Sequence, residues 1–95
     1  MMSTTRIERI QAMIKDALQP DYLDIIDDSH AHAGDPGAQD GAGHYVVSIV
    51  SNQFVGRSMV QRHQMVYSAL ASFMPMEIHA LRIKAITPDE KAATA

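Results

Sequence analysis

The sequence of 95 residues contains no cysteine. Disulfide bonds, thiol catalysis and metal sites with cysteine ligands are therefore excluded within this chain. The sequence also lacks an HExxH motif, a glycine-rich phosphate-binding pattern, and any serine–histidine–acid or paired-carboxylate arrangement that would support catalysis. We therefore expect a protein that is not an enzyme.

An excess of positive charge is absent as well. The formal net charge is −3 at pH 7, with 8 Lys and Arg against 11 Asp and Glu. This balance argues against a protein that binds nucleic acid through bulk charge alone. No apolar run approaches the roughly 20 residues that a membrane span requires. The first ten residues lack the apolar core of a signal peptide. We expect a cytoplasmic protein with no membrane partner.

The composition is that of one folded domain. Hydrophobic residues make up 46% of the chain and charged residues 20%, which is ordinary for a globular protein. A chain of this length supports one core and not two. We expect a single domain over residues 1–95, with its core at about residues 5–88, a loop at 30–43 and a short tail at 89–95.

The centre of the chain predicts a strand followed by a helix. Residues 44–51 are mostly β-branched and apolar, which indicates a well-packed strand. Gly56 then interrupts the pattern, and Ser58 stands at the N-cap position of a helix. One face of that helix carries residues spaced by four and three, namely Met59, His63, Val66, Leu70 and Phe73. A returning strand over residues 78–85 should then lie parallel to the first.

Simple alternation in the returning strand assigns its two faces. It places His79 with Leu81 and Ile83 toward the helices. The opposite set is Ile78, Ala80, Arg82 and Lys84. Arg82 and Lys84 should therefore lie on an open face of the sheet.

The flanking segments have recognisable boundaries. Thr5 and Glu8 have the spacing of a capping box, and Pro20 should end the first helix at Gln19. Residues 22–28 alternate as a short strand with one polar face. Residues 29–43 are rich in Gly, Ala and Asp, and a loop of that length is either functional or mobile. A proline at 88 and two acids after it predict a short terminal helix.

Four of the five histidines converge in this topology. His30 and His32 lie at the entry of the loop that leads into His44, and His44 and His79 begin two parallel strands. The four should gather near one end of the sheet, where neutral imidazoles would suit a transition metal. No tight ligand motif is present, so solvated histidines that cap backbone groups are the alternative. His63 lies on the apolar helix face, and we expect it to be half-buried and hydrogen-bonded to the backbone.

Several of these residues form motifs that resemble the BolA family. The matching stretches are Ser29-His30-x-His32, His44-Tyr45, Phe54-x-Gly56-x-Ser58, Arg62-His63 and Ile78-His79-Ala80-Leu81. The resemblance runs from about Arg6 to Thr87. It implies an α+β fold like that of class II KH domains, with a three-stranded mixed sheet and helices on one face. Phe54, Gly56 and His63 would be structural residues of the motif.

The resemblance also implies a function. BolA-like proteins are non-enzymatic adaptors that pair with a monothiol glutaredoxin and share a two-iron, two-sulfur (2Fe-2S) cluster with it, in iron–sulfur cluster trafficking or iron and stress signalling. The implied ligands here are His79 and His32, with His30 as the less certain neighbour. Glutaredoxin and glutathione would supply the thiolates. The isolated chain should hold no cofactor and be a monomer or a weak homodimer.

Some members of the family act instead as DNA-binding transcription regulators through the KH-like helix-turn face. KH domains that bind nucleic acid hold its backbone with a GXXG loop, but residues 55–58 read Val-Gly-Arg-Ser, with one glycine. Candidate contacts to duplex DNA are Arg57, Ser58 and Arg62. The alternative is that Arg57 and Arg62 are solvated residues at the start of the helix.

Overall fold

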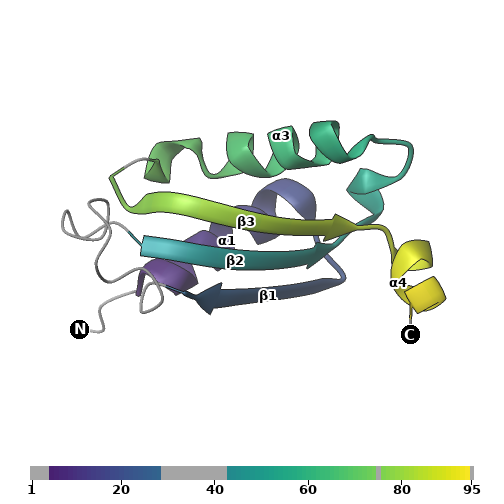
Figure 1. Ribbon diagram of the computed structural model, residues 1–95, viewed down its shortest axis with the longest axis horizontal. Coiled ribbons are helices and arrows are strands. Elements are labelled where there is room, and N and C mark those ends of the chain that lie inside the picture. The colour runs from purple at the N-terminus through teal and green to yellow at the C-terminus, as the bar shows by residue number, and fades with distance from the viewer. Residues whose placement is uncertain (1–4, 29–42, 75, 95) are drawn as a thin grey trace.

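The computed structural model describes residues 5–28, 43–74 and 76–94 (Figure 1). Within these ranges the elements are α1 (Arg6–Leu18), β1 (Tyr22–Asp27), β2 (Gly43–Val50), the 3-10 helix η2 (Asn52–Phe54), α3 (Met59–Ala69), the 3-10 helix η3 (Ala71–Phe73), β3 (Ile78–Ile86) and α4 (Pro88–Thr94). The predicted loop at 30–43 lies outside the described residues, except that Gly43 already belongs to β2.

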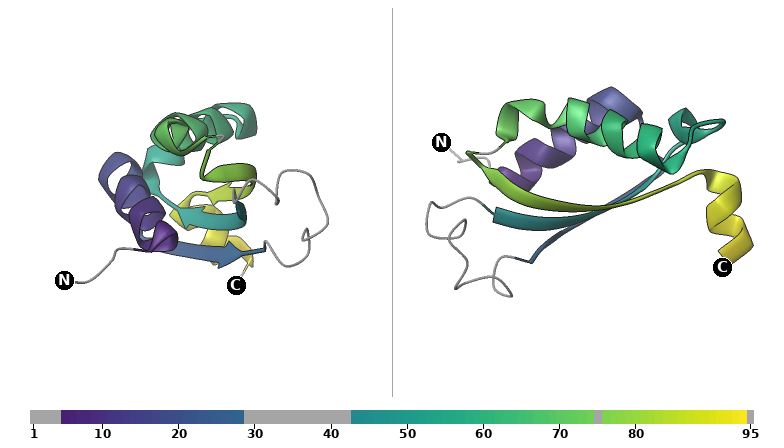
Figure 2. Two further views of the ribbon diagram at one scale, coloured as in Figure 1. Left: turned by 90° about the vertical axis from the view of Figure 1, so that its left-hand side faces the viewer. Right: turned by 45° about the horizontal axis from the view of Figure 1, so that its top comes forward.

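The three strands form one mixed sheet in the order β1-β2-β3. β1 runs antiparallel to β2, and β2 runs parallel to β3. Helices α1 and α3 lie on the same face of the sheet, whereas α4 lies at the end of the sheet where β3 ends (Figure 2). The predicted α+β fold with a three-stranded mixed sheet is therefore confirmed.

Helix α1 has the predicted boundaries. The side chain of Thr5 accepts a hydrogen bond from the Glu8 amide at 3.1 Å, which completes the capping box. Gln19 adopts a left-handed conformation with φ of 47°, just before Pro20, because a residue preceding proline is disfavoured in helical geometry. The buried residues of this helix, Ile10, Ile14 and Leu18, form one stripe that packs into the core.

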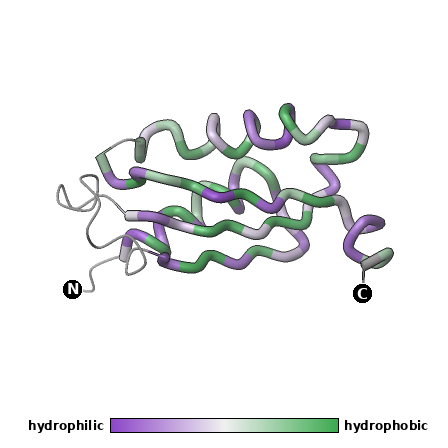
Figure 3. Tube along the Cα trace, viewed as in Figure 1, coloured by the Kyte–Doolittle hydropathy of each residue, from purple (hydrophilic) through white to green (hydrophobic). Residues whose placement is uncertain are grey.

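The core lies between the two helices and the sheet. Tyr45, Val47 and Ile49 of β2 belong to one buried cluster with Val66 of α3 and its C-cap residue Leu70. Figure 3 shows that hydrophobic and hydrophilic residues alternate along β1 and β3. The predicted apolar pattern of β2 is therefore confirmed, with the strand ending at Val50 rather than at residue 51.

The predicted apolar face of α3 is only partly buried. Val66 and Leu70 are fully buried, but Met59 is 52% exposed. Met59 and Val66 are seven residues apart and point within about 20° of each other, so the exposure of Met59 comes from its place in the first turn and not from a wrong helical phase. The helix also ends earlier than the pattern predicts, since Phe73 lies in η3.

Helix α4 is the predicted short terminal helix, and it begins at Pro88 as expected. The Thr87 amide donates to Glu90 Oε1 at 2.8 Å, and the Glu90 amide donates to Thr87 Oγ1 at 3.2 Å, so the helix has a capping box. Across the described ranges, no helix is long and apolar enough to cross a bilayer.

Candidate functional site

His79 occupies an irregular position at the start of β3. Gly43 of β2 pairs with Ile78, but the next residue, His44, pairs with Ala80, so His79 is an extra residue in the ladder. An extra residue of this kind reverses the alternation of side chains on the bulged strand. As a result Ile78 is fully buried in the core and His79 is exposed. The prediction that His79 faces the helices and Ile78 the open face was wrong, because alternation alone does not reveal a bulge.

His79 lies against His44 of the neighbouring strand. The centroids of the two imidazole rings are 5.1 Å apart, and the ring planes are tilted by 55°. The His44 side chain is nearly buried, with 6% of its surface exposed. We call the end of the sheet that carries these two residues the histidine end; it is where β2 and β3 begin (Figure 1). Sequence reasoning placed His44 there but did not name it among the ligands.

The other two histidines of the predicted group, His30 and His32, lie outside the described residues. Within the described ranges, no group of three or more His, Cys, Asp or Glu side chains could hold a metal ion. The described part of the histidine end therefore offers one exposed imidazole and one nearly buried imidazole.

A charged cluster fixes the start of β3 against α1. The guanidinium of Arg9 forms a two-pronged ion pair with the carboxylate of Glu77, with one hydrogen bond at 3.0 Å, and Arg6 lies 3.6 Å from the same carboxylate. The hydrogen bond from Arg9 lowers the pKa of Glu77 below its ordinary value of 4.5. The Glu77 carbonyl also accepts a hydrogen bond from the Gly43 amide at 3.0 Å. These contacts hold the backbone two residues before His79.

The turn between η2 and α3 contains the other predicted site. The Ser58 hydroxyl accepts from the Gln61 amide at 3.1 Å, and the Ser58 amide donates to Gln61 Oε1 at 2.8 Å, so Ser58 is the N-cap of α3 as predicted. Gly56 has φ of +77°, a left-handed conformation that favours glycine. Phe54 is fully buried. These residues shape the turn, and Arg57 is exposed on it.

Arg62 is not a surface residue. It is 6% exposed, and its guanidinium donates to the backbone carbonyls of Arg57 at 3.0 Å and Ala85 at 3.1 Å. The same group forms two hydrogen bonds to Glu90, at 2.6 and 3.2 Å. Its donors are thus used to join α3, β3 and α4. The alternative of a solvated Arg62 was wrong, and a phosphate contact by Arg62 does not fit this arrangement.

Glu90 is the acidic partner in that network. The hydrogen bond from Arg62, followed by the one from the Thr87 amide, lowers the pKa of Glu90 from 4.5 to about 2. No pattern in the sequence joins residues 62 and 90, which are brought together only by the packing of α4.

His63 is half-buried, as predicted, but its Nε2 atom is buried and has no hydrogen-bond partner in the part of the chain that the structure describes. We expected a hydrogen bond between His63 and the backbone, and Nε2 does not form one within the described residues.

The fold and the histidine end together define a class: a small α+β domain with a mixed sheet of order β1-β2-β3, an exposed histidine at the start of the parallel strand and a capped turn before α3. The family model described as BolA-like protein matches residues 14–90. The chain belongs to the BolA-like family.

Two relatives indicate the breadth of that family. The chain is 39% identical over 79 residues to human BolA-like protein 1, covering 83% of this chain and 56% of that protein. It is 35% identical over 83 residues to the DNA-binding transcriptional regulator BolA of Escherichia coli K12, covering 87% of this chain and 76% of that protein. The chain thus spans little more than half the length of the human relative.

Solved structures agree with the fold. The BolA domain of SufE1 from Arabidopsis thaliana superposes with a TM-score of 0.81 at 37% identity, covering 94% of this chain and 99% of that one. BolA1 from the same plant gives a TM-score of 0.79 at 35% identity, covering 93% and 98%.

Proposed function

We propose that this protein is a non-enzymatic adaptor that pairs with a monothiol glutaredoxin and shares a 2Fe-2S cluster with it, in iron–sulfur cluster trafficking or in iron and stress signalling. The observation that supports the proposal is the exposed His79 at the histidine end, in a chain of the BolA-like family.

His79 fits the role of an iron ligand. Its side chain is exposed, and among the described residues it forms no hydrogen bond that would occupy its ring nitrogens. Neutral imidazole is a good ligand for iron. The nearly buried ring of His44 packs beside it and restricts the orientations open to His79. His44 is thus a positioning residue in this proposal.

The remaining donors come from outside the described residues. His32 is the second ligand in our proposal, with His30 as its alternative. Because the chain has no cysteine, the thiolates come from glutaredoxin and glutathione. A cluster with imidazole on one iron has a higher reduction potential than one ligated by thiolates alone.

The test is to mix the protein with a cluster-loaded monothiol glutaredoxin and to follow the visible spectrum and lifetime of the cluster. We expect His79→Ala to change the spectrum and shorten the lifetime. His32→Ala should have a smaller effect, because a ligand from a glycine-rich segment loses more conformational freedom on binding. His63→Gln, which alters a histidine of α3, is the matched control.

Wild-type spectra and lifetimes in both the His79→Ala and His32→Ala complexes would contradict the ligand assignment. Failure of the wild-type protein to form any complex with glutaredoxin would contradict the adaptor role itself. Circular dichroism of each variant shows whether the fold is retained.

The second candidate is a DNA-binding regulator, which the name of the E. coli relative favours. The net charge of −3 and the internal use of Arg62 count against it, and Arg57 is left as the exposed arginine of the turn. Titration with duplex DNA over a salt series tests this role. Tight binding that falls steeply with salt and weakens in Arg57→Ala would favour DNA over the adaptor role.

A further inference from the structure

The sheet face opposite α1 and α3 is organised in rows across the three strands. Near the ends of β2 and β3, one row consists of Tyr22, Val50 and Ile86, which are paired in register. The next row consists of Asp24, Ser48 and Lys84. An apolar row therefore lies directly beside a polar one. Val50 lies six positions after His44 on β2, so these rows lie roughly 20 Å from the histidine end.

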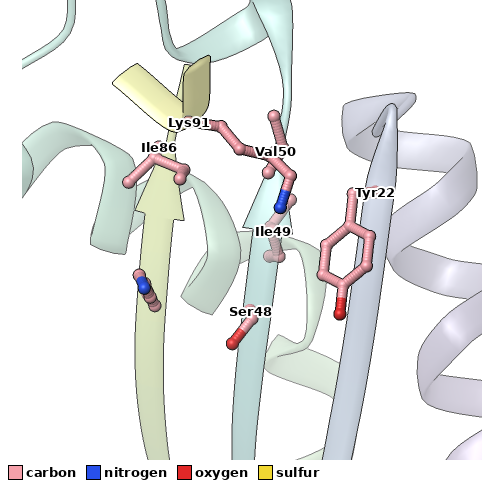
Figure 4. A pocket seen from close by; sticks show the side chains of 7 residues that line it. Tyr22, Ser48, Ile49, Val50, Ile86 and Lys91 are labelled. Carbon is pink, nitrogen blue, oxygen red and sulfur yellow. The ribbon is translucent and has the colours of Figure 1, made fainter. Parts of the chain in front are cut away.

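Helix α4 places the ammonium group of Lys91 near the apolar row, in addition to that of Lys84 in the polar row. The Nζ atom of Lys91 lies 4.5 Å from the centroid of the Tyr22 ring, a distance typical of a cation–π contact. The side chains enclose a cavity of about 170 Å³, lined by Tyr22, Ser48, Val50, Lys84, Ile86 and Lys91 (Figure 4). Figure 4 shows Lys91 extending from α4 across Val50 toward Tyr22.

A second, more open depression of about 440 Å³ adjoins the first cavity. It shares Tyr22, Val50 and Lys91 with the first cavity and is also lined by Asp21, Pro88 and Ala92. The Lys91 side chain thus lines both hollows. The second hollow adds the apolar side chains of Pro88 and Ala92 and the carboxylate of Asp21.

The charged side chains that line the first cavity are both cationic. Its lining has two ammonium groups and a serine hydroxyl but no carboxylate. Lys84 is exposed and forms no ion pair with any described residue. Asp24 shares its row with Lys84 but does not line the cavity. Ammonium groups donate hydrogen bonds and accept none, so the lining as a whole recognises an anion.

We propose that this cavity binds a small anion with a flat apolar body, such as a phosphate monoester or a carboxylate. The anionic group lies between Lys84 and Lys91, with the Ser48 hydroxyl as a further donor. The apolar body lies against Tyr22, Val50 and Ile86. The site suits a small ligand and not a nucleic acid strand, because the cavity is concave and the protein carries a net charge of −3. The assignment is independent of the proposed iron–sulfur role.

The test is a titration of the isotope-labelled protein with phenyl phosphate, followed by amide chemical shifts in NMR spectra. We expect shifts centred on Tyr22, Ser48 and Val50. Inorganic phosphate tests the anion alone, phenol tests the ring alone, and benzoate tests a carboxylate in place of phosphate. Phenyl phosphate should bind more tightly than either inorganic phosphate or phenol, because only it fills both parts of the cavity.

Three charge variants distinguish this site from general attraction to lysine. Lys84→Gln and Lys91→Gln should each weaken binding about fivefold or more, since each removes a charge-assisted contact. Lys15→Gln makes the same change at an exposed position of α1, which covers the opposite face of the sheet, and should leave binding unchanged.

Equal weakening in all three variants, or unchanged binding in Lys84→Gln and Lys91→Gln, would overturn the proposal. So would shifts without a focus on the three central residues, or binding of inorganic phosphate as tight as that of phenyl phosphate. Thermal unfolding shows whether Lys91→Gln loosens α4. If it does, Lys84→Gln decides the outcome, because Lys84 is an exposed residue of the sheet.

Discussion

Replacement of Leu70 by alanine should be among the most destabilising single changes in this protein. Leu70 is fully buried in the core between α3 and the sheet. Truncation of such a leucine costs about 2–5 kcal/mol, because it removes buried apolar groups and leaves a cavity. Leu70 follows the last helical residue of α3, so the expected loss of stability does not come from a change in helix propensity. Two-state unfolding in urea and heat measures the effect.

The expected thermal shift follows from the size of the domain. For a chain of about 100 residues or fewer, each kcal/mol lowers the unfolding temperature by roughly 4–8 °C, so Leu70→Ala should unfold at least about 8 °C below wild type. Met59→Ala is the matched control, because Met59 points to the same side of α3 but is 52% exposed. Met59→Ala should lower the free energy of unfolding by no more than about 0.5 kcal/mol. Near wild-type stability of Leu70→Ala, or an equal loss in Met59→Ala, would refute this account of the core.

Two further predictions concern α4 and the turn before α3. Arg62 lowers the pKa of Glu90 to about 2. The ionised Glu90 carboxylate therefore contributes fully to the stability of the fold above about pH 4.5, and this contribution is lost as the pH falls toward 2. Glu90→Gln should therefore flatten the pH dependence of the unfolding free energy in that window. Asp89→Asn, at the preceding position, should keep the wild-type pH dependence. Identical acid profiles for wild type and both variants would disprove the role of the Arg62–Glu90 pair. Gly56→Ala should destabilise the fold by about 1 kcal/mol through its positive φ alone, since an added Cβ would meet no atom within 4 Å. A urea midpoint equal to that of wild type would show that the turn adapts without strain.

Local patterns in the sequence predicted the elements well because they depend on neighbouring residues. The capping residues Thr5 and Ser58 and the stop at Gln19 act through hydrogen bonds and backbone geometry within one turn of chain. The alternation in β2 reports which face is buried. From these, the parallel pairing of the second and third strands and the meeting of His44 with His79 at one end followed by topology. The three-stranded mixed sheet was implied by the resemblance to the BolA family.

Tertiary structure decided the features that depend on residues far apart in the chain. The extra residue at His79 arises from pairing with Gly43 and His44 on β2, and it alone turns this imidazole outward and Ile78 into the core. Likewise, Arg62 is buried because α4 brings Glu90 to it, although its place near a helix start is typical of a solvated residue. The cavity at Lys84 and Lys91 forms only where α4 meets the end of the sheet. Sequence periodicity describes one element at a time, whereas register shifts, buried ion pairs and cavities are properties of two or more elements in contact.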